Sequence, residues 1–347
     1  MNILVSALEP SANVHLGLLL ADLKAANLKA ANVRGIFDRK FGTPIVESSE
    51  FSAMGIIDVL SKISLAKKAM NLMADEAQNC DVALLIDSPA FNIPLAKKLK
   101  KSVPNLKIIY YILPKVWAWK SGRVKVVEKY TDIQAAIFPF EKLWWQKGVF
   151  VGNPLLREIE AFRNEPAIKE NYVFLPGSRR TEIARLFPIF KQTAAKLNGK
   201  KIVVIPSHFD DKTIADLYGD LSEFSIERSA ANALQNAKFS FVCSGTATLE
   251  AALIGSPFVL AYKANAIDFF IGRRIVKLPF VGLANIIFDF AGLPPMHDEL
   301  LQNNCTAENL LKCADRADPA QFLSRSIELR KMLNGCDRPL SEIVENL

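Results

Sequence analysis

The sequence predicts an α/β protein made of two parallel-sheet domains with a cleft between them. Short apolar, β-branched runs alternate with helical patterns, as in "VALLID" followed by "IPLAKKLKK", and this alternation is typical of βαβ units. The rhythm restarts after a polar, proline-containing segment at residues 157–171. We therefore expect domains at residues 1–160 and 161–325, and a helical segment at 326–347 that packs back on the first domain.

Each expected strand is followed by an expected helix. In the first domain the pairs are 2–8 with 15–26, 82–87 with 93–101, 106–112 with 120–130, and 133–138 with 141–147. In the second domain the strands are 171–178, 200–207 and 239–245, each followed by a helical pattern. A chain of 347 residues that is 50% hydrophobic has enough apolar material for two cores.

Composition narrows the function classes. The net charge of +7 fits a polyanion, an anionic lipid surface or a phosphorylated substrate as partner. The five cysteines form no CxxC pair and the three histidines are far apart in the sequence, so we expect neither a disulfide framework nor a bound metal. No apolar stretch is long enough to span a bilayer, and no leader pattern precedes the first strand, which predicts a cytoplasmic protein.

Candidate site residues follow the strands, because ligands bind beyond the carboxyl ends of parallel strands. Asp87 ends the apolar run "LLID", where a buried charge is costly unless it has a function. It is our candidate general base, and the alternative is a helix N-cap ahead of "PAFNIPLAKK". After the first strand come three further candidates for the same site: Glu9, Ser11 and Asn13.

Two turns of the second domain predict a phosphate-binding site. One contains Gly177, Ser178 and Arg179, and the other contains Ser244, Gly245 and Thr246. Each places backbone N–H groups at the start of a helix, where anions bind. The sequence has no G-x-G-x-x-G, no P-loop and no D-x-D, which argues against a dehydrogenase, a P-loop NTPase and a metal-held nucleotide sugar. Backbone amides and arginine would then neutralise the phosphates.

Motifs along nearly the whole chain resemble those of the lipid-A-disaccharide synthase family. They are "LLIDSPAFN", "PKVWAWKSGRV", "IFPFEKLWW", "VGNPLL", "FLPGSRRTEI", "CSGTATLEAAL" and "ELLQ", in the family's order. The resemblance implies a GT-B fold of two Rossmann-like domains and an inverting transfer without metal or other cofactor. The implied reaction moves 2,3-diacylglucosamine from its UDP derivative to 2,3-diacylglucosamine 1-phosphate (lipid X), giving a β-1,6-linked disaccharide 1-phosphate and UDP.

The resemblance also implies roles for single residues. Asp87, Glu9 and Arg179 are the implied catalytic residues, with His15 as an alternative base. The acceptor would contact Glu9, Ser11, Asn13 and Asn92, although Asn13 stands where the family has an aspartate. The UDP-sugar would contact Gly177, Ser178, Arg179, Ser244, Gly245, Thr246, Glu250 and Lys263, with Glu250 on the ribose.

Aromatic and basic residues together predict a lipid-facing surface, since such clusters suit an anionic bilayer. The expected contacts are Trp144, Trp145, Phe269, Phe270, Arg273 and Arg274. We therefore expect a peripheral protein on the inner face of the cytoplasmic membrane, with a homodimer left open. One alternative is another GT-B enzyme, an epimerase or a peptidoglycan-type transferase. The other is a nucleic-acid-binding protein, which the acids Glu9 and Asp87 disfavour because they would repel phosphates.

Overall fold

The computed structural model describes residues 1–26, 32–53, 59–166, 171–265 and 278–347. It divides into two compact units. Unit 1 holds residues 1–154 and 333–347, and unit 2 holds residues 155–332. The first unit therefore ends six residues before the boundary expected at 160, and the last 15 residues belong to unit 1.

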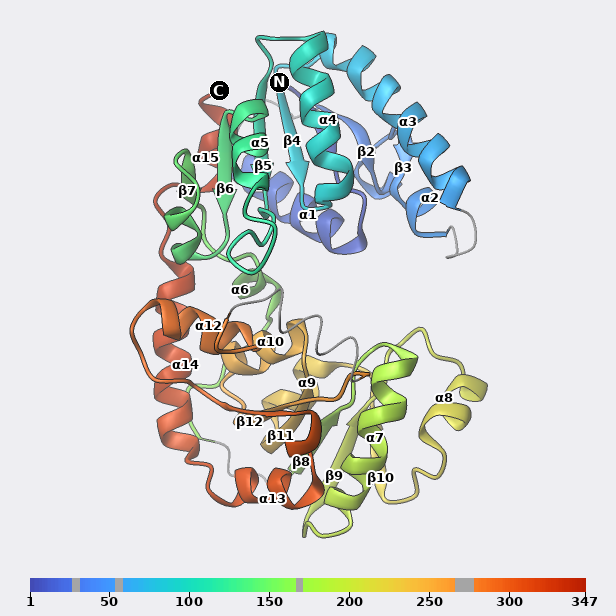
Figure 1. The fold of residues 1–347 in the computed structure, drawn as a ribbon, viewed down its shortest axis with the longest axis vertical. Helices are drawn as coiled ribbons and strands as arrows, with labels where there is room; N and C mark the ends of the chain where they lie inside the picture. The colour runs from blue at the N-terminus through green and yellow to red at the C-terminus, as the bar shows by residue number, and fades with distance from the viewer. Residues whose placement is uncertain (27–31, 54–58, 167–170, 266–277) are drawn as a thin grey trace. The chain divides into compact units, whose positions relative to one another are not determined.

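Unit 1 is a seven-stranded parallel sheet in the order β3-β2-β1-β4-β5-β6-β7 (Figure 1). Its strands are β1 Asn2–Ser6, β2 Asn32–Phe37, β3 Val46–Glu47, β4 Val82–Ile86, β5 Lys107–Tyr111, β6 Ile133–Ala136 and β7 Gly148–Phe150. Its α-helices are α1 Pro10–Ala25, α2 Ser48–Ala53, α3 Val59–Glu76, α4 Pro89–Ser102, α5 Arg123–Tyr130 and α15 Leu340–Glu345. Short 3₁₀ helices are η1 Arg39–Phe41, η2 Ala77–Asn79 and η3 Pro139–Leu143.

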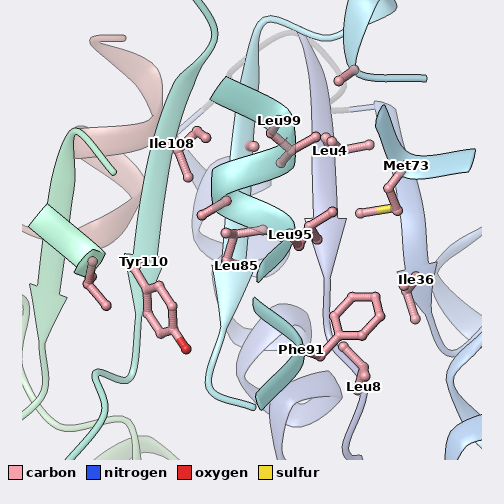
Figure 2. Close-up of a cluster of buried hydrophobic side chains, with 14 of the residues drawn as sticks. Leu4, Leu8, Ile36, Met73, Leu85, Phe91, Leu95, Leu99, Ile108 and Tyr110 are labelled. Carbon is pink, nitrogen blue, oxygen red and sulfur yellow. The ribbon is translucent and has the colours of Figure 1, made fainter. Parts of the chain in front are cut away.

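Both faces of this sheet are buried, which explains why its central strand β4, VALLI, is apolar at every position rather than at alternate ones. On one face, Leu85 of β4 packs with Leu95 and Leu99 of α4 (Figure 2). On the other face, Leu84 lies in a second cluster together with Ile343 of α15. The C-terminal helix thus completes the core of unit 1.

Unit 2 is a six-stranded parallel sheet in the order β10-β9-β8-β11-β12-β13. Its strands are β8 Asn171–Leu175, β9 Lys200–Val204, β10 Phe224–Glu227, β11 Ala237–Cys243, β12 Phe258–Tyr262 and β13 Asp298–Leu301. Its helices are α6 Leu155–Glu158, α7 Arg180–Ala194, α8 Asp211–Tyr218, α9 Ala230–Gln235, α10 Thr246–Ile254, α12 Leu283–Phe290, η4 Gln302–Asn304, α13 Ala307–Asp315 and α14 Pro319–Asn334, whose last two residues belong to unit 1.

Two arginines, Arg163, which is buried, and Arg330, which is partly buried, hold the carboxyl ends of helices in unit 2. Arg163 donates to the carbonyl of Leu234, to that of Gln235 at 3.0 Å and to that of Ala237 at 2.6 Å, where α9 ends. Arg330 of α14 in the same way donates to the last carbonyls of α10. A cation suits a helix C-terminus because unpaired carbonyls collect there. These contacts fasten the segment before β8 and helix α14 to unit 2.

Replacing Arg163 with alanine is expected to destabilise unit 2 by on the order of 3 kcal/mol, because buried carbonyls lose a charged donor. All four tryptophans, at positions 117, 119, 144 and 145, lie in unit 1. Urea unfolding followed by circular dichroism should therefore shift, while the tryptophan fluorescence transition stays in place. The exposed Lys212→Ala serves as the control. A shift in the fluorescence transition alone would contradict this account.

Candidate active site

The first candidate site lies where the strand order of unit 1 reverses, between β1 and β4. In open parallel sheets this switch point is the place where ligands bind. Glu9 follows β1 and precedes α1, and Asp87 follows β4. The topology therefore places these two acids at neighbouring strand ends, as the sequence predicts.

The backbone of Asp87 is held in an unusual conformation. Asp87 has φ of +50° and Ser88 has φ of +40°, which non-glycine residues rarely adopt. Three hydrogen bonds fix the turn: the Asp87 N–H donates to the Tyr111 carbonyl at 2.9 Å, and the Asp87 carbonyl accepts from the Tyr110 hydroxyl at 2.7 Å and from the Asn92 amide at 2.9 Å. Strain of this kind costs about 1–3 kcal/mol per residue and is concentrated at functional sites.

The side chain of Asp87 does not cap the following helix. The N-cap of α4 is Ser88, and no side chain makes a capping hydrogen bond there. Burial raises the pKa of the Asp87 carboxyl, and the charge of Glu9 raises it further. A hydrogen bond from the Ser88 N–H and the charges of Lys115 and His15 lower it by smaller amounts. A raised pKa suits a general base, because the pKa of its conjugate acid then lies closer to the pH at which the reaction takes place.

Glu9 and His15 share this site with Asp87. The Ser88 hydroxyl donates to Glu9 Oε1 at 3.1 Å, which links the turn after β4 to the turn after β1. The His15 ring meets the ring of Tyr111 edge-on, with centroids 6.1 Å apart. The structure thus brings the predicted base, second acid and histidine of unit 1 together. Ser11 is exposed on the first turn of α1.

The Glu9–Asp87 coupling predicts a pH effect. Removing the Glu9 charge in Glu9→Gln should lower the pKa of Asp87, since a nearby negative charge disfavours ionisation. The acid limb of the kcat/KM profile, which reports the free enzyme's base, should then move to lower pH. The control is Asp75→Asn, which neutralises an exposed acid on α3. An acid limb that stays in place, or moves to higher pH, would argue against Asp87 as the titrating group.

Two predicted acceptor-binding residues have their polar groups turned towards the protein. Asn92 is fully buried, accepts from the Ser6 hydroxyl at 2.6 Å and donates to the carbonyls of Ile86 and Asp87. Asn13, 3% exposed, donates to the carbonyls of Ala7 and Glu9 and to the Ser48 hydroxyl, and accepts from the Asp38 N–H. We therefore assign both asparagines to positioning the two turns rather than to contact with an acceptor.

The second candidate site lies at the switch point of unit 2, between β8 and β11. Gly177, Ser178 and Arg179 follow β8, and Ser244, Gly245 and Thr246 follow β11. Gly177 has φ of +109°, and a Cβ there would come within 3.2 Å of the Cys243 sulfur at the end of β11. The two turns are thus side by side, and Gly177 cannot carry a side chain.

The N-termini of helices α7 and α10 differ in whether a side chain already binds there. At α7 the Glu182 carboxylate accepts from the Arg179 N–H at 3.3 Å and from Arg179 Nη1 at 2.7 Å. A carboxylate of the protein itself therefore already occupies the N-terminus of α7. At α10 no side chain caps the helix, and a Cβ on its N-cap Gly245 would meet nothing within 4 Å. The N-terminus of α10 is therefore the better site for a phosphate.

Glu182 is a site residue that the sequence analysis did not single out. Its side chain is 14% exposed while that of Arg179 is 79% exposed, so the carboxylate holds one end of a guanidinium that otherwise extends into solvent. The available signal was the spacing: an acid three residues after a helix N-cap is the usual second half of a capping box.

Glu250 lies on the second turn of α10, and Lys263 follows β12, the neighbour of β11. Burial raises the pKa of the Glu250 carboxyl, and Glu158 adds to the rise. Because α10 carries both an open N-terminus and this carboxylate, one helix offers donors for phosphate and acceptors for hydroxyl groups.

The predicted lipid-facing residues have mixed outcomes. The exposure expected for Trp145 is wrong: its side chain is 2% exposed and belongs to the core cluster that includes Leu85 and Leu95. Trp144 is partly buried against the same cluster. Two other large apolar side chains of the same region are more exposed: Trp119, at 41%, and Leu143, at 72%. Phe269, Phe270, Arg273 and Arg274 lie outside the described residues.

Comparison with known proteins gives one consistent result. A family model described as lipid-A-disaccharide synthetase matches residues 3–317. The sequence is 45% identical to lipid-A-disaccharide synthase of Campylobacter jejuni strain RM1221, over 99% of each chain. It is 44% identical to that of Helicobacter pylori strain P12, over 95% of this chain and 94% of the relative. The structure of MurG from Acinetobacter baumannii shares the fold, with a TM-score of 0.56 at 13% identity, over 100% of this chain and 99% of that one.

Proposed function

The chain belongs to the lipid-A-disaccharide synthase family, and we propose that its own residues carry out the family's transfer from the two sites described above. Its fold is the GT-B fold of two parallel-sheet domains. In this proposal unit 2 binds UDP-2,3-diacylglucosamine and unit 1 binds 2,3-diacylglucosamine 1-phosphate. The acceptor's 6-hydroxyl attacks the anomeric carbon of the donor sugar, the bond from that carbon to the UDP oxygen breaks, and the acceptor's proton goes to a base.

The observation that carries the assignment of the base is the turn at Asp87. Its backbone is fixed in a strained conformation by three hydrogen bonds, its side chain caps no helix, and burial raises its pKa. Glu9 keeps the site acidic and would orient the acceptor, with His15 as the neighbouring alternative base. A positioned base of this kind typically contributes 10²- to 10⁴-fold to rate.

In unit 2 we assign each polar group to contact one part of the UDP-sugar. The uncapped N-terminus of α10, with Ser244, Gly245 and Thr246, binds the diphosphate, and Lys263 is a further contact. Arg179 stabilises the leaving diphosphate as negative charge develops on it, with Gly177 and Ser178 forming the adjacent turn. Glu250 accepts hydrogen bonds from the ribose diol, since one carboxylate can take two donors.

Replacing Glu250 with alanine should weaken UDP binding by about 1.5–3 kcal/mol, the range for hydrogen bonds to a charged group. Calorimetric titration of UDP measures this directly and needs no turnover. The matched control is Glu308→Ala, an acid on α13 that pairs with Lys312 at the surface. Unchanged UDP affinity in Glu250→Ala would remove this residue from the ribose.

We also propose that the protein attaches peripherally to the inner face of the cytoplasmic membrane, where its acylated substrates reside. In the described part of the chain, no helix is long and apolar enough to cross a bilayer. Trp119 has the ammonium of Lys120 at 4.3 Å and the guanidinium of Arg123 at 5.3 Å from its ring centroid. An exposed ring flanked by cations suits the headgroup region of an anionic membrane. Trp119 therefore replaces Trp145 as the proposed contact.

A further inference from the structure

The segment between β5 and α5, residues 112–122, forms a wall of the Asp87 site in unit 1. Strands β4 and β5 are parallel neighbours, with Ile86 opposite Tyr111, so the chain leaves both strands at the same edge. The Asp87 N–H bonds to the Tyr111 carbonyl, and the Tyr110 hydroxyl bonds to the Asp87 carbonyl. The first residues of the segment therefore lie close to the proposed base.

The segment is held in place by a buried acid. Trp117 is 9% exposed and donates its indole N–H to Glu141 Oε1 at 3.2 Å. The other Glu141 oxygen accepts from the N–H groups of Ile137 and Phe138 at 3.1 and 3.2 Å. The Trp117 ring also meets the ring of Phe140 edge-on at 5.3 Å. These contacts fix the position of the residues on either side of Trp117.

Lys115 on this segment and Arg123, which directly follows it at the start of α5, have no acidic partner among the described residues. In the portion of the chain that the structure describes, the Lys115 ammonium and the Arg123 guanidinium form no ion pair within 4 Å, although acids are near. Lys115 is exposed, and its positive charge lowers the pKa of the carboxyls of both Asp87 and Glu141. Arg123 is the first residue of α5. Its charge lowers the pKa of the Tyr110 hydroxyl, which donates a hydrogen bond to the Asp87 carbonyl.

Building on the proposed function, we infer that Lys115 and Arg123 bind the anomeric phosphate of the acceptor. The acceptor carries its 6-hydroxyl on the carbon attached to C5 and its phosphate on C1, and C5 and C1 are the two carbons that flank the ring oxygen of one pyranose. A base at Asp87 must take the proton of the hydroxyl, so the dianionic phosphate requires cations about one sugar ring away on the same unit. Lys115 and Arg123 are cations that follow the strand end beside Asp87, whereas Glu9 and Asp87 would repel the phosphate.

The inference predicts which acceptors the enzyme prefers. Loss of one charge-assisted hydrogen bond should reduce kcat/KM for the phosphorylated acceptor by roughly 10- to 100-fold. The same loss should not apply to an acceptor that lacks the phosphate. The informative quantity is therefore the ratio of kcat/KM for 2,3-diacylglucosamine 1-phosphate to that for 2,3-diacylglucosamine.

The experiment measures this ratio in detergent micelles for the full-length wild type, Lys115→Gln, Lys115→Arg and Arg123→Gln. We expect a large ratio in the wild type, a ratio reduced by at least 10-fold in both glutamine variants, and recovery in Lys115→Arg. Lys125→Gln is the matched control, because this exposed lysine lies two positions beyond Arg123 and so about 200° around α5. The tryptophan fluorescence of each variant verifies that unit 1, which holds all four tryptophans, is folded.

Each contrary result has a separate meaning. If the wild type forms disaccharide equally well from both acceptors, the inference is wrong and the proposed function stands. If Lys115→Gln slows both acceptors equally, the cations serve the fold or a lipid headgroup, and the inference is again overturned. If the wild type forms disaccharide from neither acceptor, the proposed function itself fails.

Discussion

Asp87→Asn is expected to lower turnover by roughly 10²- to 10⁴-fold while the protein keeps its fold and its affinity for UDP. Asparagine tolerates the left-handed backbone conformation found at residue 87 and keeps the backbone hydrogen bonds of the turn. The substitution therefore removes the proton acceptor with little structural change. Single-turnover measurements with a saturating donor would separate the chemical step from binding.

Asp81→Asn is the matched control for this variant, since Asp81 precedes the same strand at its opposite end. It should leave turnover within a few-fold of the wild type. Turnover of a folded Asp87→Asn enzyme that is also within a few-fold of the wild type would end the assignment of Asp87 as base. Glu9 and His15 would then be the groups to replace next.

Arg179→Gln should lower kcat by roughly 10²- to 10³-fold, the usual effect of removing one donor from a developing oxyanion. UDP affinity should fall much less, because Glu182 holds Arg179 in the free protein and the contact with the diphosphate strengthens as the bond to the sugar breaks. Steady-state kinetics with parallel calorimetry would show this difference.

The control for Arg179 is Arg185→Gln, a change of an exposed arginine on the same helix. Equal losses in kcat and in UDP affinity for Arg179→Gln would show that this residue binds the ground state and the transition state alike. The assignment of Arg179 to the leaving group would then be wrong, although its place at the start of α7 would remain.

The main features of the fold follow from the sequence because strands such as β4 and β12 are continuous apolar runs, and the runs alternate with helical patterns. Positions such as Asp87, Glu9 and Gly177 could be found because they stand directly after such runs. The domain boundary was less accurate: α6 lies in unit 2, and α14 carries the chain from unit 2 to the terminal helix of unit 1. The return of the C-terminal segment to the first domain was expected, whereas the residue at which the chain passes between units depends on long-range packing that leaves no local pattern.

Side-chain direction was the part of the site that local patterns could not give. Asn13 and Asn92 follow strands, as Glu9 and Asp87 do. The side-chain amides of both asparagines are nevertheless hydrogen-bonded within the protein. Trp144 and Trp145 are adjacent in the sequence, yet Trp145 belongs to the core cluster while Trp144 is only partly buried against it. The Glu182–Arg179 pair depends on the helix geometry at α7, where i and i+3 side chains meet.

The most direct test of the whole account is mass spectrometry of the product formed from synthetic UDP-2,3-diacylglucosamine and 2,3-diacylglucosamine 1-phosphate. The account predicts one lipid product whose mass is the sum of the two substrates minus UDP, formed by the wild type and strongly reduced with Asp87→Asn. A donor that is only hydrolysed or epimerised, with the acceptor recovered unchanged, would contradict it.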